Sequence, residues 1–429
     1  MPRFRFLHAA DLHLDSPLVG LAKKSAAAAA RVEEASRRAF DALVDLAIAE
    51  DCAFVLIAGD LFDGEWRHYG TGVHFAGQMA KLAEAGIAVF VIFGNHDAEN
   101  RFLSRLDFSD NVRRFASERP QTHVIETLDV AVHGQSFARR DVTDNLAAAY
   151  PPPIAGAFNI GLLHTACGGR EGHASYAPCT VEQLRNHGYD YWALGHVHTR
   201  EVLCERPAIV FPGNIQGRNP RERGPKGATL VTVEDGAITD LVHRDLDVLR
   251  FHEEAIDVAG AATSEDLRSL LRAGLTRAAA AGAGRPVALR LRLVGAGPLH
   301  DDLSRRRAMI AEEVETLAAA DGHDLWLEKL VIATSPPTAP RAAVDAGLAG
   351  RLRTILADLV AEDRVAALID ARLAALESRI PEAAHRDDLL AEMRREIGPR
   401  AVALARATSE GGVLDDDAGG DAAAAAEAG

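Results

Sequence analysis

The sequence predicts an α/β fold, because apolar strand-like runs alternate with helical stretches in its first hundred residues. The runs cover residues 4–9, 53–58 and 87–93, and helices are expected over 26–50 and 72–85. The runs are almost continuously apolar, which is typical of parallel strands that are covered on both faces. A polar cluster follows each run, and ligands of open α/β sheets bind at the carboxyl ends of the strands. We therefore expect βαβ units with a site at one edge of the sheet.

Further strands are expected in the next 150 residues. They cover 124–132, 157–163, 189–194, 208–211, 228–233 and 238–243. The last two flank Glu234-Asp235-Gly236, and an Asp-Gly pair between two apolar runs is a hairpin signal. This hairpin closes a first domain, which we predict to cover residues 1–246.

The rest of the chain is expected to hold a smaller α/β unit and a helical region. In the smaller unit, strands are predicted over 251–258, 287–294 and 325–333, and helices over 264–280 and 301–320. The predicted segments are an α/β domain over 247–335, a proline-rich linker over 336–341, amphipathic helices over 342–408 and an acidic disordered tail over 409–429.

Composition restricts the class of protein. No apolar run approaches the roughly 20 residues that a membrane-spanning helix needs. The first residues lack the apolar core and cleavage site of a signal peptide. We therefore expect a cytoplasmic protein without membrane contact. The four cysteines form no CxxC pair and are expected to be reduced thiols rather than disulfides or zinc ligands.

The net charge of −15 argues against a protein that coats nucleic acid over its whole surface. Residues 409–429 contain four Asp and two Glu without Lys or Arg, so they account for −6 of this charge. The remaining −9 is compatible with a local basic patch.

Metal-ligating residue types follow the predicted strands. They are Asp11, His13, Asp60, Asn95, His164, His196 and His198. Oxygen and nitrogen donors without a thiolate suit Mn²⁺, Fe²⁺ or Zn²⁺. Seven donors exceed the need of one tetrahedral ion and suit two ions with a shared ligand, for which the two oxygens of Asp60 are appropriate. Two ions roughly 3.5–4 Å apart can hold a phosphoryl group and activate water.

The stretch Gly94-Asn95-His96-Asp97 adds an imidazole that the metal ions do not need. We expect His96 to stabilise the transition state or to protonate the leaving oxygen, and Asp97 to orient it. Taken singly, such residues are more often turns, caps or buried core histidines. Five polar clusters, each after an apolar strand of one domain, argue against a purely structural origin.

These motifs resemble those of the calcineurin-like metallophosphoesterase superfamily over residues 4 to about 245. The matching set is Asp11-x-His13, Gly59-Asp60, Gly94-Asn95-His96-Asp97, His164 and Gly195-His196-x-His198. The resemblance implies a four-layer αββα sandwich of two sheets flanked by helices, with His96 as the catalytic histidine. It also implies two metal sites that share Asp60. One would be completed by Asp11, His13 and His198, and the other by Asn95, His164 and His196.

A finer resemblance is to the SbcD-like DNA-repair exonucleases, in particular their YhaO-type branch. It rests on 58–63, 211–219 and 224–227, and more loosely on the smaller α/β unit, which is similar to the capping domain of those nucleases. The resemblance implies a DNA exonuclease or endonuclease that uses two divalent ions, with Mn²⁺ favoured. It also implies a homodimer, and docking of the C-terminal helices onto an SbcC-like coiled-coil ATPase.

A basic loop follows the strand at 208–211. Arg218, Arg221, Arg223 and Lys226 are four cations within nine residues, against the single anion Glu222. We predict that they contact nucleic-acid phosphates near the metal ions. A solvated loop with salt bridges is an equally weighted alternative.

Three functions remain open at this point. A DNA nuclease is favoured, because a small-substrate enzyme needs neither the second domain nor the C-terminal helices. A small-molecule nucleotide phosphodiesterase on the same core is the first alternative. A non-catalytic metal-binding scaffold is the second, and the complete ligand set together with His96 argues against it.

Overall fold

The structure, a computed structural model, describes most of the chain up to residue 361. The described residues are 2–16, 34–63, 70–98, 100, 108–168, 176–337, 348–361, 364, 367–368 and 370–372. They belong to two compact units. The first comprises Met1–Glu254, Leu275–Arg290 and Glu315–Lys329, and the second comprises Ala255–Gly274, Leu291–Val314 and Leu330–Gly429. Within the described residues, no helix has the length and apolar character needed to cross a membrane.

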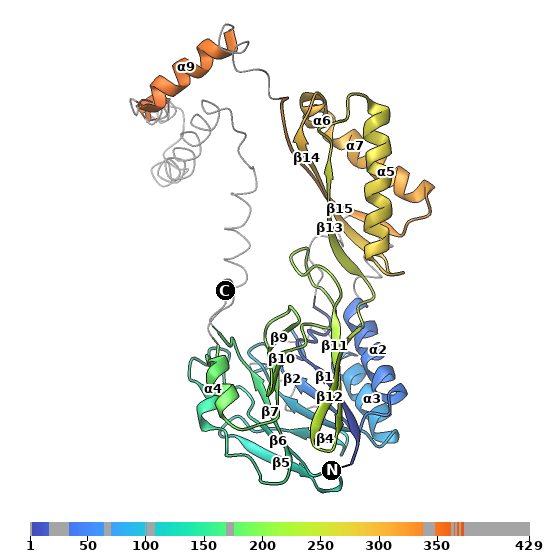
Figure 1. The fold of residues 1–429 in the computed structure, drawn as a ribbon, viewed down its shortest axis with the longest axis vertical. Helices are drawn as coiled ribbons and strands as arrows, with labels where there is room; N and C mark the ends of the chain where they lie inside the picture. Colours follow the sequence, from blue (N-terminus) through green and yellow to red (C-terminus); the bar gives the residue numbers. More distant parts are fainter. Residues whose placement is uncertain are drawn as a thin grey trace, which may run out of the picture. The chain divides into compact units, whose positions relative to one another are not determined.

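The first sheet of unit 1 has six strands in the order β12-β11-β1-β2-β3-β4. Figure 1 draws this sheet together with the helices beside it. Its strands are β1 (Phe4–Ala9), β2 (Phe54–Ala58), β3 (Ala88–Ile92), β4 (Val112–Arg114), β11 (Gly227–Glu234) and β12 (Ala237–Asp245). The strands β1 to β4 are parallel, and β11 pairs antiparallel with β1. Helices α2 (Ala35–Ala49) and α3 (Gly70–Glu84) connect the first three strands. The predicted βαβ units and the hairpin of β11 and β12 are confirmed.

The second sheet also has six strands, in the order β5-β6-β7-β8-β10-β9. They are β5 (Gln121–Ile125), β6 (Val130–Gly134), β7 (Phe158–His164), β8 (Tyr191–Gly195), β9 (Glu201–Glu205) and β10 (Ala208–Phe211). Strands β6, β7, β8 and β10 are parallel, whereas β5 and β9 run antiparallel to their neighbours. The short helices η3 (Leu146–Ala149) and α4 (Val181–Asn186) lie in the connections.

The single strand predicted over 124–132 is wrong, because the chain turns back within it. A 3-10 turn, η2 (Glu126–Leu128), joins β5 to β6, and these two strands pair antiparallel. Asp129 ends the turn with φ of 54°. Aspartate tolerates this left-handed backbone better than most residues, so the chain can reverse there.

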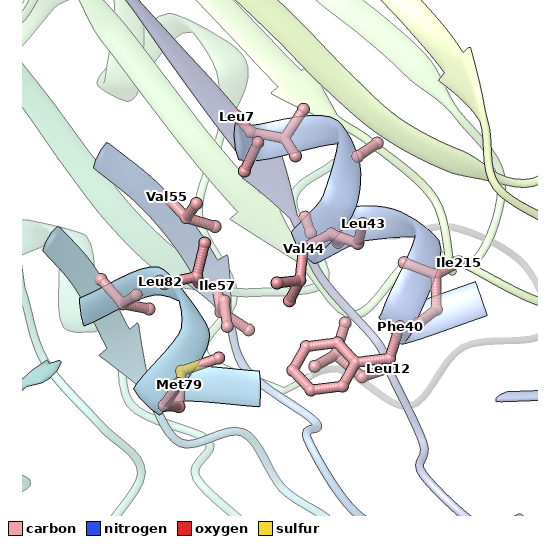
Figure 2. Close-up of a cluster of buried hydrophobic side chains, with 14 of the residues drawn as sticks. Leu7, Leu12, Phe40, Leu43, Val44, Val55, Ile57, Met79, Leu82 and Ile215 are labelled. Atoms are coloured by element: carbon pink, nitrogen blue, oxygen red, sulfur yellow. The ribbon is translucent and has the colours of Figure 1, made fainter. Parts of the chain in front are cut away.

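Strand β2 shows why the apolar runs are continuous. Alternate side chains of a strand point to opposite faces of the sheet. Val55 and Ile57 join the cluster that packs against α2 and α3, together with Phe40, Leu43 and Met79 (Figure 2). Phe54, Leu56 and Ala58 join the cluster on the other face. All five residues of β2 are buried, so each of its apolar side chains packs into one of the two hydrophobic clusters.

The second face of β2 packs against the second sheet. Phe6 and Phe54 stack with ring centroids 5.0 Å apart, and Tyr191 of β8 meets Phe6 edge-on at 5.2 Å. The far face of the second sheet is covered by α4, where Leu184 packs with Trp192. The order is therefore helices, sheet, sheet, helix, which confirms the four-layer sandwich.

A three-stranded sheet with the order β13-β14-β15 follows the sandwich in sequence. Its elements are β13 (Arg250–Asp257), α5 (Ser264–Ala281), β14 (Val287–Ala296), α6 (His300–Arg305), α7 (Arg307–Ala320) and β15 (Leu325–Ser335). Every predicted element is present, although the helix expected over 301–320 is interrupted at Arg306. The boundary at residues 246 and 247 stays a prediction.

The described C-terminal region contains α9 (Leu348–Ala361). The linker from residue 338, most of the predicted helical region and the whole of 409–429 lie outside the described residues. The four cysteines are free thiols, as predicted, and Cys204 is the least buried of them.

Candidate metal centre

The ends of five strands bring the predicted ligands together. Asp11 follows β1, Asp60 follows β2, Asn95 follows β3, His164 ends β7 and His196 follows β8. Three groups each place their ligand atoms within 4.8 Å of one another: Asp11 with His13 and His198, His13 with Asp60 and His96, and Asp60 with His164 and His196. Asn95 adds its Oδ1 at 3.0 Å from His164 Nε2. The structure thus places all seven predicted ligands in one centre.

Left-handed backbone orients several of these side chains. The φ angles are 52° at Asp11, 41° at His13, 52° at Asp60 and 100° at His196. Such angles cost of order 1–3 kcal/mol for residues other than glycine and concentrate at functional sites. Backbone bonds from Asp11 N to Gly59 O and from His13 N to Asp60 O, both 3.0 Å, hold the loops in this form. The loop conformation, rather than strand alternation, directs Asp11 and His13.

Two motif glycines allow the strand ends to approach. A Cβ atom at Gly94 would overlap Oδ1 of Asp60, and one at Gly195 would overlap the carbonyl oxygen of Ala58. A larger residue at Gly94 would therefore push apart the loops after β2 and β3, and one at Gly195 would push β8 away from β2 of the other sheet.

Hydrogen bonds set the tautomers of two histidines. Nδ1 of His164 lies 2.9 Å from the carbonyl oxygen of Ala58, which can only accept, so Nδ1 carries the proton. Nδ1 of His198 lies 2.8 Å from Oε1 of Glu222 and donates in the same way. Nε2 of each ring is then the nitrogen that a metal ion would bind. Nε2 of His198 faces Nε2 of His13 at 3.2 Å, as two ligands of one ion would.

The charges of the centre also fit bound cations. Asp11 and Asp60 are each only 1% exposed. Burial raises the pKa of Asp11 to about 6. Burial also acts to raise the pKa of Asp60, but His164 outweighs it and the pKa falls below its usual range. Buried carboxylates are costly without positive partners, and divalent ions supply that charge. The donor set and its burial therefore fit divalent metal ions.

His96 differs from the ligand histidines in its exposure and its partner. Its side chain is 28% exposed, whereas that of His13 is 1% exposed. Nδ1 of His96 lies 3.0 Å from Oδ1 of Asp63. Burial acts to lower the pKa of His96, but the bond to Asp63 raises it above the ordinary value. His96 is thus an accessible, oriented imidazole beside the metal ligands.

The role predicted for Asp97 is wrong. Its carboxylate accepts from the backbone N–H groups of Leu61, Phe62 and Gly94 at 3.0, 3.0 and 3.1 Å. It therefore fixes the loops after β2 and β3, and Asp63 is the carboxylate that orients His96. Adjacency in sequence does not make two side chains meet, because their direction depends on the loop.

The comparisons with known proteins agree with this centre. Residues 4–200 match the calcineurin-like phosphoesterase family, and residues 251–335 match the middle domain of metallophosphoesterase YhaO. Metallophosphoesterase YhaO of Bacillus subtilis is 38% identical over 297 residues, which cover 68% of this chain and 72% of YhaO. The chain belongs to the calcineurin-like metallophosphoesterase family. It is accordingly a metal-dependent phosphoesterase, a hydrolase.

More distant relatives of this metallophosphoesterase carry the name DNA double-strand break repair protein Mre11. The protein of Methanopyrus kandleri is 26% identical over 299 residues, which cover 63% of each chain. That of Sulfurisphaera tokodaii is 24% identical over 247 residues, which cover 54% of this chain and 60% of the relative. These matches agree with the resemblance to the SbcD-like branch.

The structure bears on the predicted phosphate contacts of the basic loop of this metallophosphoesterase, and it excludes one of them. Lys226 is 5% exposed and donates from Nζ to the carbonyl oxygen of His198 at 2.8 Å, so its predicted phosphate contact is wrong. Arg218 turns inward and lies 3.0 Å from Oδ2 of Asp63. Arg221 and Arg223 are exposed, and for them the phosphate contact stays a prediction.

Sequence reasoning assigned no role to two residues of the centre. Asp63 lies three positions after Asp60, in a motif that supports only the family resemblance. Glu222 is the single anion of the basic loop in the sequence, and in the structure it contacts His198. A carboxylate within an otherwise basic loop was the signal that could have pointed to it.

Proposed function

We propose that this metallophosphoesterase is a two-metal phosphodiesterase that cleaves DNA. The observation that carries the proposal is the position of His96, accessible and paired with Asp63, beside seven converging metal-ligand side chains. A scaffold that only binds metal has no use for an oriented imidazole next to its ligands. This arrangement supports catalysis rather than metal storage.

The residues would have separate roles in the reaction. Asp11, His13, Asp60 and His198 would hold one ion, and Asp60, Asn95, His164 and His196 the other. Divalent ions at these residues supply a Lewis acid for the phosphoryl oxygens and lower the pKa of water. The bond from Nδ1 of His96 to Asp63 leaves Nε2 pointing away from that carboxylate. The bond to Asp63 raises the pKa of His96 and so favours the protonated ring, whose Nε2–H would donate to the leaving oxygen.

DNA is the proposed substrate for two reasons. The relatives named Mre11 are DNA double-strand break repair proteins. In addition, the loop that carries exposed Arg221 and Arg223 also carries Arg218, which lies against Asp63. Exposed arginines beside a phosphodiesterase centre suit the backbone phosphates of a long substrate.

The test is hydrolysis of end-labelled linear double-stranded DNA by the purified protein with Mn²⁺. An EDTA control, a His96→Ala variant and a phosphodiester dye substrate run beside it. We expect degradation of DNA that both controls abolish. Cleavage of the dye alone would favour a small-molecule phosphodiesterase, or access to DNA only with a partner. No cleavage of either substrate by protein that binds two Mn²⁺ ions would favour the scaffold.

We also propose that the C-terminal helices dock onto an SbcC-like coiled-coil ATPase. Apolar side chains at the start of this region support it, because Ile355 of α9 is 53% exposed and Leu368 is 52% exposed. An amphipathic helix with such residues can lie in an apolar groove or against another helix. Truncation after residue 340 should abolish ATPase binding and spare dye hydrolysis. A truncated chain that still binds the ATPase would remove these helices from the interface.

A further inference from the structure

We propose that Glu222 is a positioning residue for His198, so that the loop over residues 214–226 controls occupancy of one metal site and not of the other. This inference rests on the proposed two-metal function. It concerns the site formed by Asp11, His13, Asp60 and His198.

The contact between the two side chains is short and sheltered. Oε1 of Glu222 lies 2.8 Å from Nδ1 of His198, and the side chains are 13% and 20% exposed. A carboxylate that accepts from one ring nitrogen fixes the tautomer and the ring plane, and it makes the other nitrogen a better ligand. Glu222 therefore presents Nε2 of His198 to the metal site.

Glu222 is itself held in place by its own loop. Its Oε2 accepts from Nδ2 of Asn214 at 2.6 Å and from the backbone N–H of Arg218 at 2.7 Å. Its Oε1 also accepts from Nδ2 of Asn219 at 3.1 Å. Donors on both oxygens restrict the rotation of the carboxylate. The residue is thus a fixed support rather than a surface side chain that meets His198 by chance.

The same loop also holds the backbone of His198. Nζ of Lys226 donates to the carbonyl oxygen of His198 at 2.8 Å, and the backbone N–H of Asn214 approaches that oxygen at 3.4 Å. Both the ring and the main chain of His198 are therefore positioned by residues 214–226.

The second metal site is built differently. The corresponding Nδ1 of His164 is held by the carbonyl oxygen of Ala58, which belongs to β2 of the core. No side chain of the 214–226 loop takes part in that bond. A change at Glu222 should therefore weaken the site that contains His198 and leave the site that contains His164 intact. A general loss of folding or of charge would not discriminate between the two metal sites.

The experiment is a calorimetric titration of the metal-free full-length protein with Mn²⁺. The wild type should bind two ions. Glu222→Gln should bind one ion as the wild type does and the other about 10–100-fold more weakly, the usual effect of losing such a partner. Glu222→Asp keeps the charge but is one methylene shorter, so it should show the same selective loss. The matched control is Glu253→Gln, because Glu253 pairs with Arg223 of the same loop at 2.6 Å and touches no metal ligand in the described contacts.

A second measurement does not depend on metal. Nitrogen-15 NMR of the imidazoles of metal-free protein should show His198 protonated at Nδ1 in the wild type and in Glu253→Gln. That preference should be lost in both Glu222 variants, while far-ultraviolet circular dichroism stays unchanged.

The outcomes separate the two proposals. The role of Glu222 would be overturned if Glu222→Gln bound both ions with wild-type affinity or weakened both sites equally. It would also be overturned if the tautomer of His198 were unchanged in the Glu222 variants. A wild type that binds fewer than two ions would instead overturn the two-metal function, and the tautomer would still report on the contact of Glu222 with His198.

Discussion

Asp63→Asn tests whether the pair of His96 and Asp63 acts in catalysis. The substitution keeps the shape of the side chain but removes the charge that lies 3.0 Å from Nδ1 of His96. Two unit charges at that separation interact by about 5.5 kcal/mol at an effective dielectric of 20. Solvent reduces this value, since the two side chains are 28% and 21% exposed. We expect kcat to fall about 10²–10³-fold, within the range for general acid catalysis.

The assay is steady-state hydrolysis of the dye phosphodiester and of DNA, with metal content measured in the same samples. Metal content matters because Oδ1 of Asp63 also lies 3.5 Å from Nδ1 of the ligand His13. Residues that act as a unit have non-additive effects, so the double variant of Asp63→Asn and His96→Ala should be no slower than His96→Ala. The proposal that Asp63 and His96 act as a pair would be refuted if Asp63→Asn kept kcat within threefold of the wild type at full metal content. It would also be refuted if the losses in kcat of the two single variants added up in the double variant.

Three further predictions concern stability. Saturating Mn²⁺ at about 100 times its dissociation constant should raise the Tm of metal-free protein by about 5–10 °C per site, as measured by calorimetry, because the ions bind only the folded centre. Arg250→Met should lower the free energy of unfolding in urea by roughly 3 kcal/mol, because it removes the nearer ion-pair partner of the buried Asp247 carboxylate. Among the described residues, the ion-pair partner that remains is Arg285 at 3.4 Å. Arg37→Ala should cost about 1 kcal/mol at pH 7, and urea unfolding at several pH values should show this cost disappearing in acid.

The sign of the pH effect follows from the carboxylate of Asp15. Burial acts to raise its pKa, but the bonds from Arg37 and Thr71 lower it below 3.8. A depressed pKa stabilises the folded protein above pH 3.8, and this contribution is lost as the pH falls through the folded pKa. An Arg37→Ala deficit that persisted undiminished at pH 3 would contradict the assignment. The prediction for Arg250→Met would be contradicted by a variant as stable as the wild type. The prediction for Mn²⁺ would be contradicted by a Tm that does not change when Mn²⁺ is added.

Much of the fold could be predicted from local patterns. The βαβ units, the hairpin at Asp235-Gly236 and the α/β elements after residue 250 follow from hydrophobic periodicity and turn residues. Local patterns failed where one backbone angle decided the outcome. Asp129 with φ of 54° divides one predicted strand into β5 and β6, and no alternation of side chains signals such an angle.

The ligand set was also accessible from sequence, because its chemistry resides in residue type and in position after a strand. Parallel strands must end at one edge of a sheet, so Asp60 and Asn95 had to approach each other once their strands were recognised. The identity of the residues and their positions after predicted strands therefore predicted a candidate metal centre.

Only the tertiary structure decided which side chains support that centre. Asp63 rather than Asp97 meets His96, Lys226 is buried beneath His198, and Glu222 holds the ring of His198. These contacts depend on loop conformation and join residues 24 to 33 positions apart, between elements that the sheets bring together. Side-chain direction in a loop is set by its backbone angles and its packing, and neither follows from residue type or spacing.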